Sequence, residues 1–400
     1  MPFNSTNNPA TPALGIASDF VTPQATFRQK CRRVLADGLY HSRLLHVLRC
    51  MERTRRLQFA PGSFVPQIRS FPASKFGILC YHRVGTKGVP YHSRLEPRIF
   101  EAQMRYLKKH YRIISVAQVC RELQDGPAVS PTLAITFDDG YLDLYTYAFP
   151  VLRELKIPAT IYLIGDCLKT GEAPWYDGIF AAVHSAPGNA LEVQMDSVRS
   201  FPLRSPLERS SAAWEIVCHL RSVPDADRRA WCQEFETRLP LGRRELRDRM
   251  LMGTQVREMF GRGISFGAHT MSHPSVSRLG LSALENELGR SRRFLETELD
   301  AEVLDFAYPF GKPTDCSLSA EKALSRFGYR SAVTTSEGIN STGANLLRLR
   351  RLQIGDESSI ALFAFAVARL FLESVMETPH VYEADIHQRG PVSQTTGVAN

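Results

Sequence analysis

Short apolar segments of strand character alternate with amphipathic segments along most of this 400-residue chain. The pattern predicts strands at residues 78–84, 112–115, 133–137 and 159–163, and helices at 96–111, 118–123, 144–155, 281–299 and 319–327. Residues 360–373 are apolar on nearly all faces, which predicts a buried or docked helix that is too short to span a bilayer. Parallel strands need a crossover connection, usually a helix, so this alternation is typical of a parallel β/α architecture. The length is more than one average domain and fits one barrel with additions.

Two adjacent carboxylates, Asp138 and Asp139, follow the apolar segment 133–137 and precede Gly140. Side chains alternate along a strand, so both carboxylates can serve one site only if the strand ends there, as the glycine indicates. They would then lie at the carboxyl end of a strand, where α/β proteins place their chemistry. Taken alone, Asp-Asp-Gly is more often a helix N-cap, with Asp139 binding backbone N–H groups.

A pair of histidines follows another short apolar strand 130 residues further along the chain. His269 comes directly after residues 263–268, and His273 follows four residues later. On a helical turn this spacing places both imidazoles on one face, where they can bind one cation. Two histidines and one carboxylate with an open position form a catalytic zinc arrangement, whereas a structural site closes with a fourth protein ligand. Such a pair alone is more often incidental, but beside a strand-terminal Asp-Asp it favours a metal site.

A third strand-like segment, residues 303–307, runs into the turn Tyr308-Pro309-Phe310-Gly311. A turn of this kind can direct a backbone N–H group, here that of Phe310, into a site as an oxyanion donor. By itself the segment indicates only a turn.

Together the three segments resemble the motifs of the polysaccharide deacetylases, carbohydrate esterase family 4. The family's Thr-Phe-Asp-Asp-Gly motif corresponds to residues 136–140, its His-Ser/Thr-x-x-His motif to 269–273, and its Pro-Tyr/Phe-Gly motif to 309–311. The motifs occur in the family's order, and residues 78–84 and 327–332 add to the likeness. The resemblance covers roughly residues 74–375 and implies an α/β fold, the distorted (β/α) barrel of the polysaccharide deacetylase type.

The resemblance also implies a chemistry, the removal of N-acetyl groups from amino sugars of a polysaccharide. The absence of a signal segment and the basic helix described below extend the expected substrates to a lipid-linked glycan precursor. Asp139, His269 and His273 would bind a divalent metal, with zinc as the expected ion. Asp138 would be the general base. The turn formed by Tyr308, Pro309 and Phe310 would contact the substrate and stabilise the oxyanion. The physics agrees, because a divalent ion polarises the amide carbonyl while a neighbouring carboxylate accepts a proton from water.

Two departures from the family's pattern concern the residues around the base. An arginine that many members carry two residues before the motif-three proline is Ala307 here. Whatever orients Asp138 must come from elsewhere, and Arg348, Arg350 and Arg351 are unassigned candidates.

The second departure concerns the general acid. The family's late Leu-x-Ile/Val-x-x-His motif aligns with residues 352–357, which places Glu357 where a histidine is expected. A glutamate would need a raised pKa to act as an acid near neutral pH. His82, after the first strand, is a tentative site residue, although a lone histidine there is more often structural. The acid stays unassigned, and two alternatives stay open: a carbohydrate-binding protein on a degenerate scaffold, and a metal-independent cyclic amidase.

The expected organisation has three parts. Residues 1–73 are expected to form an extension, which begins as a polar, disordered segment and continues as a basic amphipathic helix. Residues 74–375 are expected to form the catalytic domain, and residues 376–400 a flexible tail. A mainly helical insertion at about 165–255 interrupts the domain; it includes Trp175-Tyr176-Asp177 and expected helices near 210–221 and 227–238. The insertion can cover the cleft or serve packing alone.

The positive charge is concentrated in the extension. Residues 1–76 hold 11 of the 49 Lys and Arg residues but 3 of the 41 Asp and Glu residues, so the whole excess of +8 lies there. The helix expected at 27–57 can lie on an anionic membrane or pack against the barrel with a solvated arginine face. No nucleic-acid reader motif accompanies it, so no nucleic-acid partner is expected. With no apolar signal segment and eight scattered cysteines, the expected location is the cytoplasm, with peripheral contact at the inner membrane face.

Overall fold

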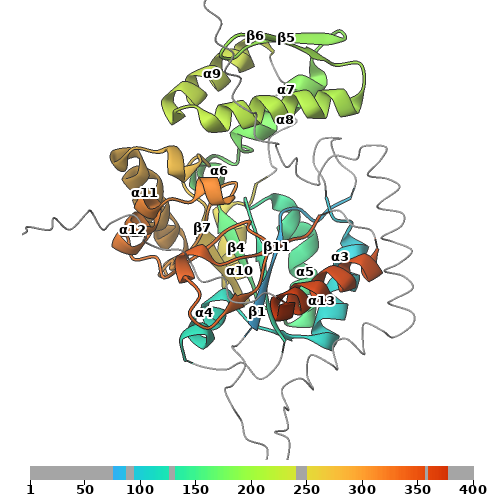
Figure 1. Ribbon diagram of the computed structural model, residues 1–400, viewed down its shortest axis with the longest axis vertical. Coiled ribbons are helices and arrows are strands. Elements are labelled where there is room, and N and C mark those ends of the chain that lie inside the picture. Colours follow the sequence, from blue (N-terminus) through green and yellow to red (C-terminus); the bar gives the residue numbers. More distant parts are fainter. Residues whose placement is uncertain (1–74, 87–93, 126–130, 240–249, 356–358, 377–400) are drawn as a thin grey trace, which may run out of the picture.

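The computed structural model describes residues 75–86, 94–125, 131–239, 250–355 and 359–376, and its centre is a curled, mostly parallel sheet (Figure 1). The strand order is β10-β1-β3-β4-β7-β8-β9, with β11 also paired to β1 and β2 to β3. The strands are β1 Lys75–Tyr81, β2 Arg112–Ile113, β3 Thr132–Phe137, β4 Ala159–Leu163, β7 Ile264–Ala268, β8 Asp305–Ala307, β9 Ser331–Val333, β10 Asn340–Ser341 and β11 Leu352–Gln353. All of these strand pairs are parallel except β1 with β10. The curled sheet and its helices form a half-barrel, which confirms the expected distorted (β/α) barrel fold.

The segment 349–353 links the two ends of the curled sheet. Leu349 forms a parallel bridge with Val333 beside β9, and β11 pairs with β1 through Leu352 and Gln353. Between these two attachments lies Arg351, whose backbone N–H donates to Ser336 O at 2.9 Å. The position of residue 351 is therefore set by both ends of the sheet.

Helices pack around the outside of the sheet, and those that were predicted from the sequence lie close to their expected ranges. The helices of the barrel are α3 Pro97–His110, α4 Val116–Asp125, α5 Phe149–Leu155 with the π-turn Leu144–Ala148 before it, α6 Gly165–Thr170, α10 Gly253–Phe260, α11 Leu281–Leu299, α12 Leu318–Arg326 and α13 Ile360–Met376. Alternate strand residues face opposite sides: Ile135 and Phe137 pack in the helix-facing core, while Ala134 packs in the barrel interior. The apolar helix expected from residue 360 onward is α13, whose Phe363 and Phe371 are buried in the helix-facing core.

A separate lobe lies over the carboxyl ends of the strands, at the top of Figure 1. It consists of α7 Trp175–Ser185, the hairpin β5 Ala190–Gln194 and β6 Val198–Pro202, α8 Pro206–Ser222 and α9 Asp225–Arg238. The two helices expected in this stretch are confirmed. The antiparallel hairpin was not predicted, because Val193 and Phe201 are the only buried hydrophobic residues on its strands and the alternation is too short to recognise. The lobe has its own core, which includes Ile179, Ala213 and Ile216.

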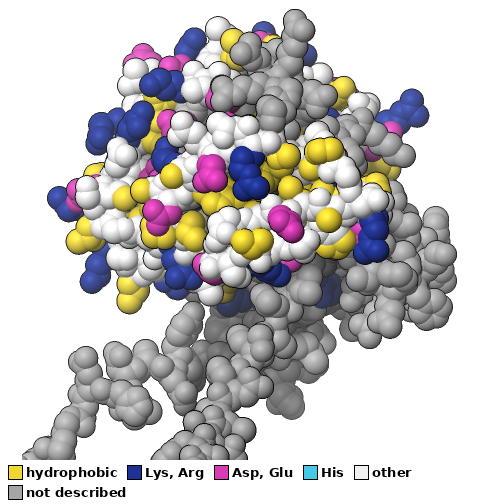
Figure 2. Space-filling view, turned by 90° about the horizontal axis from the view of Figure 1, so that it is seen from above, with side chains coloured by type: hydrophobic (Ala, Val, Ile, Leu, Met, Phe, Trp, Pro, Cys, Tyr) yellow, Lys and Arg dark blue, Asp and Glu magenta, His cyan; other side chains and the backbone are white. Residues whose placement is uncertain are grey.

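Apolar side chains lie among charged ones on the face of the lobe that points away from the barrel (Figure 2). Val198 and Leu207 are exposed hydrophobic residues of the lobe. Within the described ranges, no helix has both the length and the apolar character that a membrane span requires. The basic helix expected at 27–57 lies outside the described residues, and so does the expected tail 376–400 apart from Met376, the last residue of α13.

Candidate active site

The structure brings Asp139, His269 and His273 together at the carboxyl ends of β3 and β7. Asp139 Oδ1 lies 3.5 Å from His269 Nε2 and 3.6 Å from His273 Nε2. One donor atom from each residue lies within 4.8 Å of the others, and all three side chains are buried. Residues 130 positions apart therefore present two nitrogens and one oxygen to a common point, a donor set that can hold a divalent metal ion.

The aspartates separate because β3 ends at Phe137. Asp138 still continues the ladder through its N–H, which donates to Tyr81 O at 3.0 Å, and its side chain points into the barrel like that of Thr136. Asp139 and Gly140 then adopt left-handed backbone with φ of 71° and 82°. This turn directs the two neighbouring carboxylates to different partners.

The histidines lie on a loop, so the helical turn expected from their spacing is wrong. The loop folds back on itself because Thr270 and His273 both adopt left-handed backbone, with φ of 64° and 58°. The buried Glu287 of α11 holds the loop by accepting N–H hydrogen bonds from Met271 at 2.8 Å and Ser272 at 3.0 Å. Convergence of the imidazoles thus depends on a tertiary contact, which the i, i+4 pattern alone does not encode.

Backbone strain is concentrated at this site. Six non-glycine residues in the described ranges have positive φ, and four of them, Asp139, Thr270, His273 and Phe310, belong to the three motif loops. Left-handed backbone is unfavourable for residues with a β-carbon and persists where surrounding structure imposes it, most often at functional sites.

Hydrogen bonding and burial prepare the histidines for a metal. His269 Nδ1 lies 2.7 Å from Ala307 O, so it donates to this carbonyl and leaves the Nε2 lone pair free. Burial lowers the pKa of His269 and of His273 and favours the neutral form that binds cations. Ala307, which stands where many family members have an arginine, contributes its backbone oxygen.

Helix α7 of the lobe supports two of the candidate ligands. Trp175 Nε1 donates to His273 O at 3.2 Å, and the Tyr176 ring lies 5.0 Å from the His273 ring, centroid to centroid. The Tyr176 hydroxyl also interacts with the Asp139 carboxyl group. The segment 175–177, noted in the sequence as the start of a different region, is thus part of the site.

We expect Tyr176→Phe to weaken metal binding by about 10-fold to 100-fold, because groups that orient a ligand contribute on that scale. The measurement is competition for the ion against a chromophoric chelator. Tyr145→Phe is the matched control, since it removes an exposed hydroxyl that donates to Glu258 at 2.6 Å. Equal affinities of the two variants would contradict a supporting role for Tyr176.

A buried arginine binds Asp138 through both carboxylate oxygens. Arg351 Nη1 lies 2.7 Å from Oδ1 and Nη2 lies 2.6 Å from Oδ2, while Arg351 Nε donates to Thr334 O at 2.7 Å. Burial alone would raise the pKa of Asp138, but the charge and hydrogen bonds of Arg351 outweigh it and hold that pKa well below its usual value. Arg351 thus holds Asp138 in place of the arginine missing at Ala307.

The other two candidates do not reach the base. Arg348 pairs with Glu321, and Arg350 is exposed. Nothing in the local sequence distinguishes these three arginines; the closure of the sheet through residues 349–353 selects Arg351.

The remaining candidates are placed differently. His82 Nε2 lies 4.0 Å from Asp138 Oδ2, and its side chain is 43% exposed. The Tyr308 ring packs in the helix-facing core against Phe306, while the Phe310 ring lies 4.9 Å from that of His273. Pro309, which lies between Tyr308 and Phe310 in the sequence, is buried. Glu357 lies outside the described residues.

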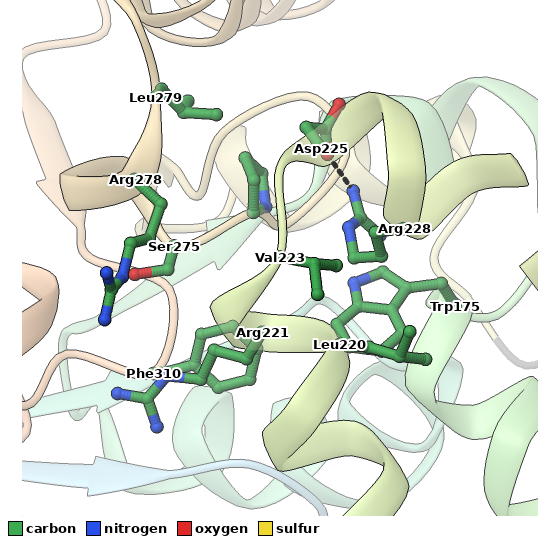
Figure 3. Close-up of a pocket in the computed structure, with 11 residues that line it drawn as sticks. Trp175, Leu220, Arg221, Val223, Asp225, Arg228, Ser275, Arg278, Leu279 and Phe310 are labelled. Carbon is green, nitrogen blue, oxygen red and sulfur yellow. Dashed lines mark hydrogen bonds and ion pairs between the residues drawn. The ribbon is translucent and has the colours of Figure 1, made fainter. Parts of the chain in front are cut away.

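A small pocket lies where the lobe meets the chain segments that carry Ser275 and Phe310 (Figure 3). Arg228 lies over the Trp175 ring at 4.7 Å, and Arg221 lies over the Phe310 ring at 4.6 Å. Arg221 also donates to Asp315 Oδ1 at 3.0 Å. Arg221 thus attaches the lobe to the turn that carries Phe310, and Trp175 attaches it to the histidine loop.

We expect metal retention to depend on a proton at Asp139. Burial raises the pKa of its carboxyl to about 6, and the nearby Asp138 carboxylate adds to the rise. Because the ion must displace that proton, affinity should be constant above about pH 6 and fall as the pH drops below it. Because burial lowers the pKa values of the two histidines, protons compete with the metal for their nitrogens only at more acidic pH. Zinc release followed with a metal-responsive dye tests this, and release that begins well above pH 7 would contradict it.

Comparison with known proteins agrees with this geometry. The polysaccharide deacetylase family model matches residues 125–197 and 235–332, which include the aspartate, histidine and aromatic-turn motifs. A candidate polysaccharide deacetylase of Bacillus subtilis (strain 168), YxkH, is 22% identical over 298 residues, covering 74% of this chain and 77% of that protein. The poly-β-1,6-N-acetyl-D-glucosamine N-deacetylase of Escherichia coli (strain K12) is 35% identical over 71 residues, which cover 17% of this chain and 10% of the relative.

A solved structure shows the same fold. The Streptococcus pyogenes deacetylase PplD, in complex with acetate, superimposes with a TM-score of 0.51 at 20% identity, covering 75% of this chain and 99% of that one. The motifs, their convergence at one end of the curled sheet and these matches lead to one conclusion: the chain belongs to the polysaccharide deacetylase family, carbohydrate esterases that act on N-acetyl amide bonds.

Proposed function

We propose that this protein is a metal-dependent N-deacetylase that hydrolyses the acetamide group of an N-acetylated amino sugar in a glycan. The observation that supports it most is the convergence of Asp139, His269 and His273 beside a carboxylate held by a buried arginine. Two nitrogens and one oxygen fit zinc with a position left open for chemistry.

Each residue near the ligands has a role in this proposal. A divalent ion bound by the three ligands would polarise the acetamide carbonyl and acidify water. Asp138 accepts the proton of the attacking water, and its lowered pKa keeps it ionised throughout the neutral range. The N–H of Phe310, which makes no hydrogen bond within the described part of the chain, donates to the developing oxyanion.

We assign protonation of the leaving amine to His82. It lies on the open side of Asp138, 4.0 Å from that carboxylate, and is exposed enough to reach a substrate.

The substrate class in this proposal is an N-acetylglucosamine-type glycan, either a polysaccharide or a lipid-linked precursor. The match to an E. coli poly-β-1,6-N-acetyl-D-glucosamine N-deacetylase supports the sugar, and the eight arginines of residues 27–57 support contact with anionic lipid at the inner membrane face. Deleting residues 1–57 should move the protein from the membrane fraction to the soluble one. An unchanged distribution would rule out this location for the extension.

The central test measures acetate released from N-acetylglucosamine oligomers by metal-stripped and zinc-loaded protein. We expect one ion per chain, loss of acetate release on stripping and recovery on reloading. His269→Ala should prevent loading, whereas His184→Ala, a histidine of the lobe bonded to Ser210, should not. Equal activity without metal would instead indicate a metal-independent amidase, and stable zinc binding without acetate release would indicate a carbohydrate-binding protein.

A further inference from the structure

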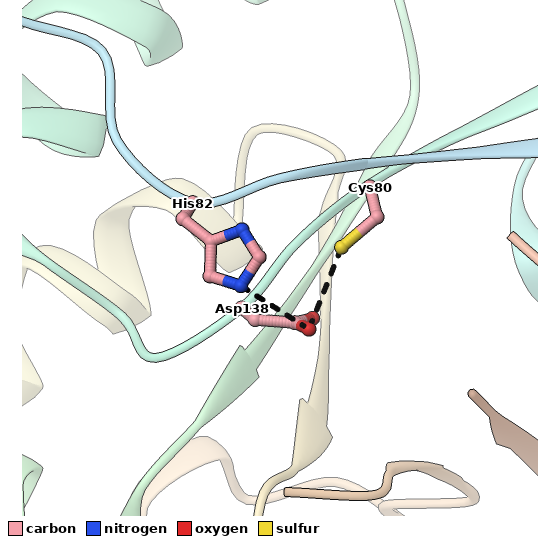
Figure 4. Close-up of side chains that lie close together, drawn as sticks. All are labelled: Cys80, His82 and Asp138. Carbon is pink, nitrogen blue, oxygen red and sulfur yellow. Dashed lines mark hydrogen bonds and ion pairs between the residues drawn. The ribbon is translucent and has the colours of Figure 1, made fainter. Parts of the chain in front are cut away.

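We propose that Cys80, His82 and Asp138 form a second cation site that takes a thiophilic ion, such as excess Zn²⁺ or Cd²⁺ (Figure 4). The site shares no residue with the Asp139–His269–His273 set, yet it lies directly beside it because Asp138 and Asp139 are consecutive. It offers one sulfur, one nitrogen and one oxygen, a combination that favours zinc and its heavier relatives over magnesium or calcium.

Strand geometry brings the three donors together. Cys80 and His82 are two positions apart at the end of β1, so their side chains can face the same side, toward Asp138 in Figure 4. Cys80 pairs in register with Thr136 of β3, two residues before Asp138. As a result, Cys80 Sγ lies 3.5 Å and His82 Nε2 lies 4.0 Å from the same oxygen, Asp138 Oδ2.

The ion pair with Arg351 leaves room for a cation on Asp138. A carboxylate has about four lone-pair positions, and a bidentate arginine occupies two of them. Cys80 is fully buried whereas the His82 side chain is 43% exposed, so an ion would enter past His82. Binding replaces the thiol proton of Cys80, which releases one proton per ion.

The consequence for activity rests on the proposed function. An ion in this position would bind both the general base and the residue assigned to protonate the leaving amine. Zinc would then support the reaction at one equivalent and inhibit it in excess. The binding itself does not depend on that assignment, because it follows from the three donors alone.

The test adds Cd²⁺ to the zinc-loaded full chain and follows bound metal, ultraviolet absorbance and acetate release together. The first site contains no sulfur, so a thiolate-to-metal charge-transfer band reports only on a cysteine-containing site. We expect a second equivalent to bind with this band and activity to fall in parallel. Cys80→Ser should abolish the band and weaken the second equivalent by at least about tenfold, the scale on which ligand contacts contribute.

Cys218→Ser, at an exposed cysteine, is the matched control and should retain both the band and the inhibition. Cys80→Ala repeats the comparison if the serine variant does not fold. Absence of a second equivalent, or a band that persists without Cys80, would overturn the second site. A Cys80-dependent band without inhibition would support the site and overturn the role proposed for Asp138.

Discussion

Replacing Asp138 by asparagine is expected to lower kcat for acetate release by about 10²-fold to 10⁴-fold, the range of a general base. Metal content should stay at the wild-type level, because Asp139, His269 and His273 are unchanged. Parallel assays of acetate and bound zinc measure the two effects. A variant that loses zinc in proportion to activity would contradict the assignment of separate roles, with Asp138 as the base and Asp139 as the metal ligand.

Stability must be controlled in this experiment, because the asparagine leaves the buried Arg351 without its carboxylate. Asp143→Asn is the matched control: Asp143 is also buried and accepts from an arginine, with Arg83 Nε at 2.7 Å. Both variants should unfold more easily, but only Asp138→Asn should lose most of its kcat. Similar loss of kcat in both would attribute the effect to stability.

Replacing Arg351 by methionine is expected to lower the free energy of unfolding by about 3–5 kcal/mol, the scale for removing one partner of a buried ion pair. Asp138 would be left buried without compensation, because both of its oxygens are bound by this guanidinium. Urea denaturation measures the loss. Arg350→Met, at an exposed neighbour, should change stability little, and an equal loss in both variants would contradict the argument.

The pH dependence of that loss has a definite sign. A lowered native pKa stabilises the fold above the ordinary value of 3.8 and loses its effect as the pH falls through the native pKa. The difference between wild type and Arg351→Met should therefore be complete near neutral pH and shrink in acid. In the variant, burial raises the pKa of Asp138, so the acid limb of kcat/KM should move to higher pH.

The fold was predictable to the extent that it depends on local pattern. Apolar segments ending in Asp138, His269 and Tyr308 were expected to be strands, and β3, β7 and β8 end within two residues of these positions. Periodicity also located α11 to the residue, since its buried positions recur every three or four residues. The β5–β6 hairpin escaped prediction because one buried hydrophobic residue on each strand leaves no period to detect.

The sequence by itself determined which residue types stand at the strand ends, because a run of strand formers followed by a turn places its next side chains at one edge of a parallel sheet. The tertiary structure alone decided three features: the left-handed loop that turns His269 and His273 toward one point, the choice of Arg351 over Arg348 and Arg350, and the approach of Tyr176 and Cys80 to the aspartates. Each of these contacts joins elements that are distant in the chain. The geometry of these contacts depends on how the sheet curls and closes through residues 349–353, and on how α7 and α11 pack against the loops. The spacing of nearby residues encodes neither of these arrangements.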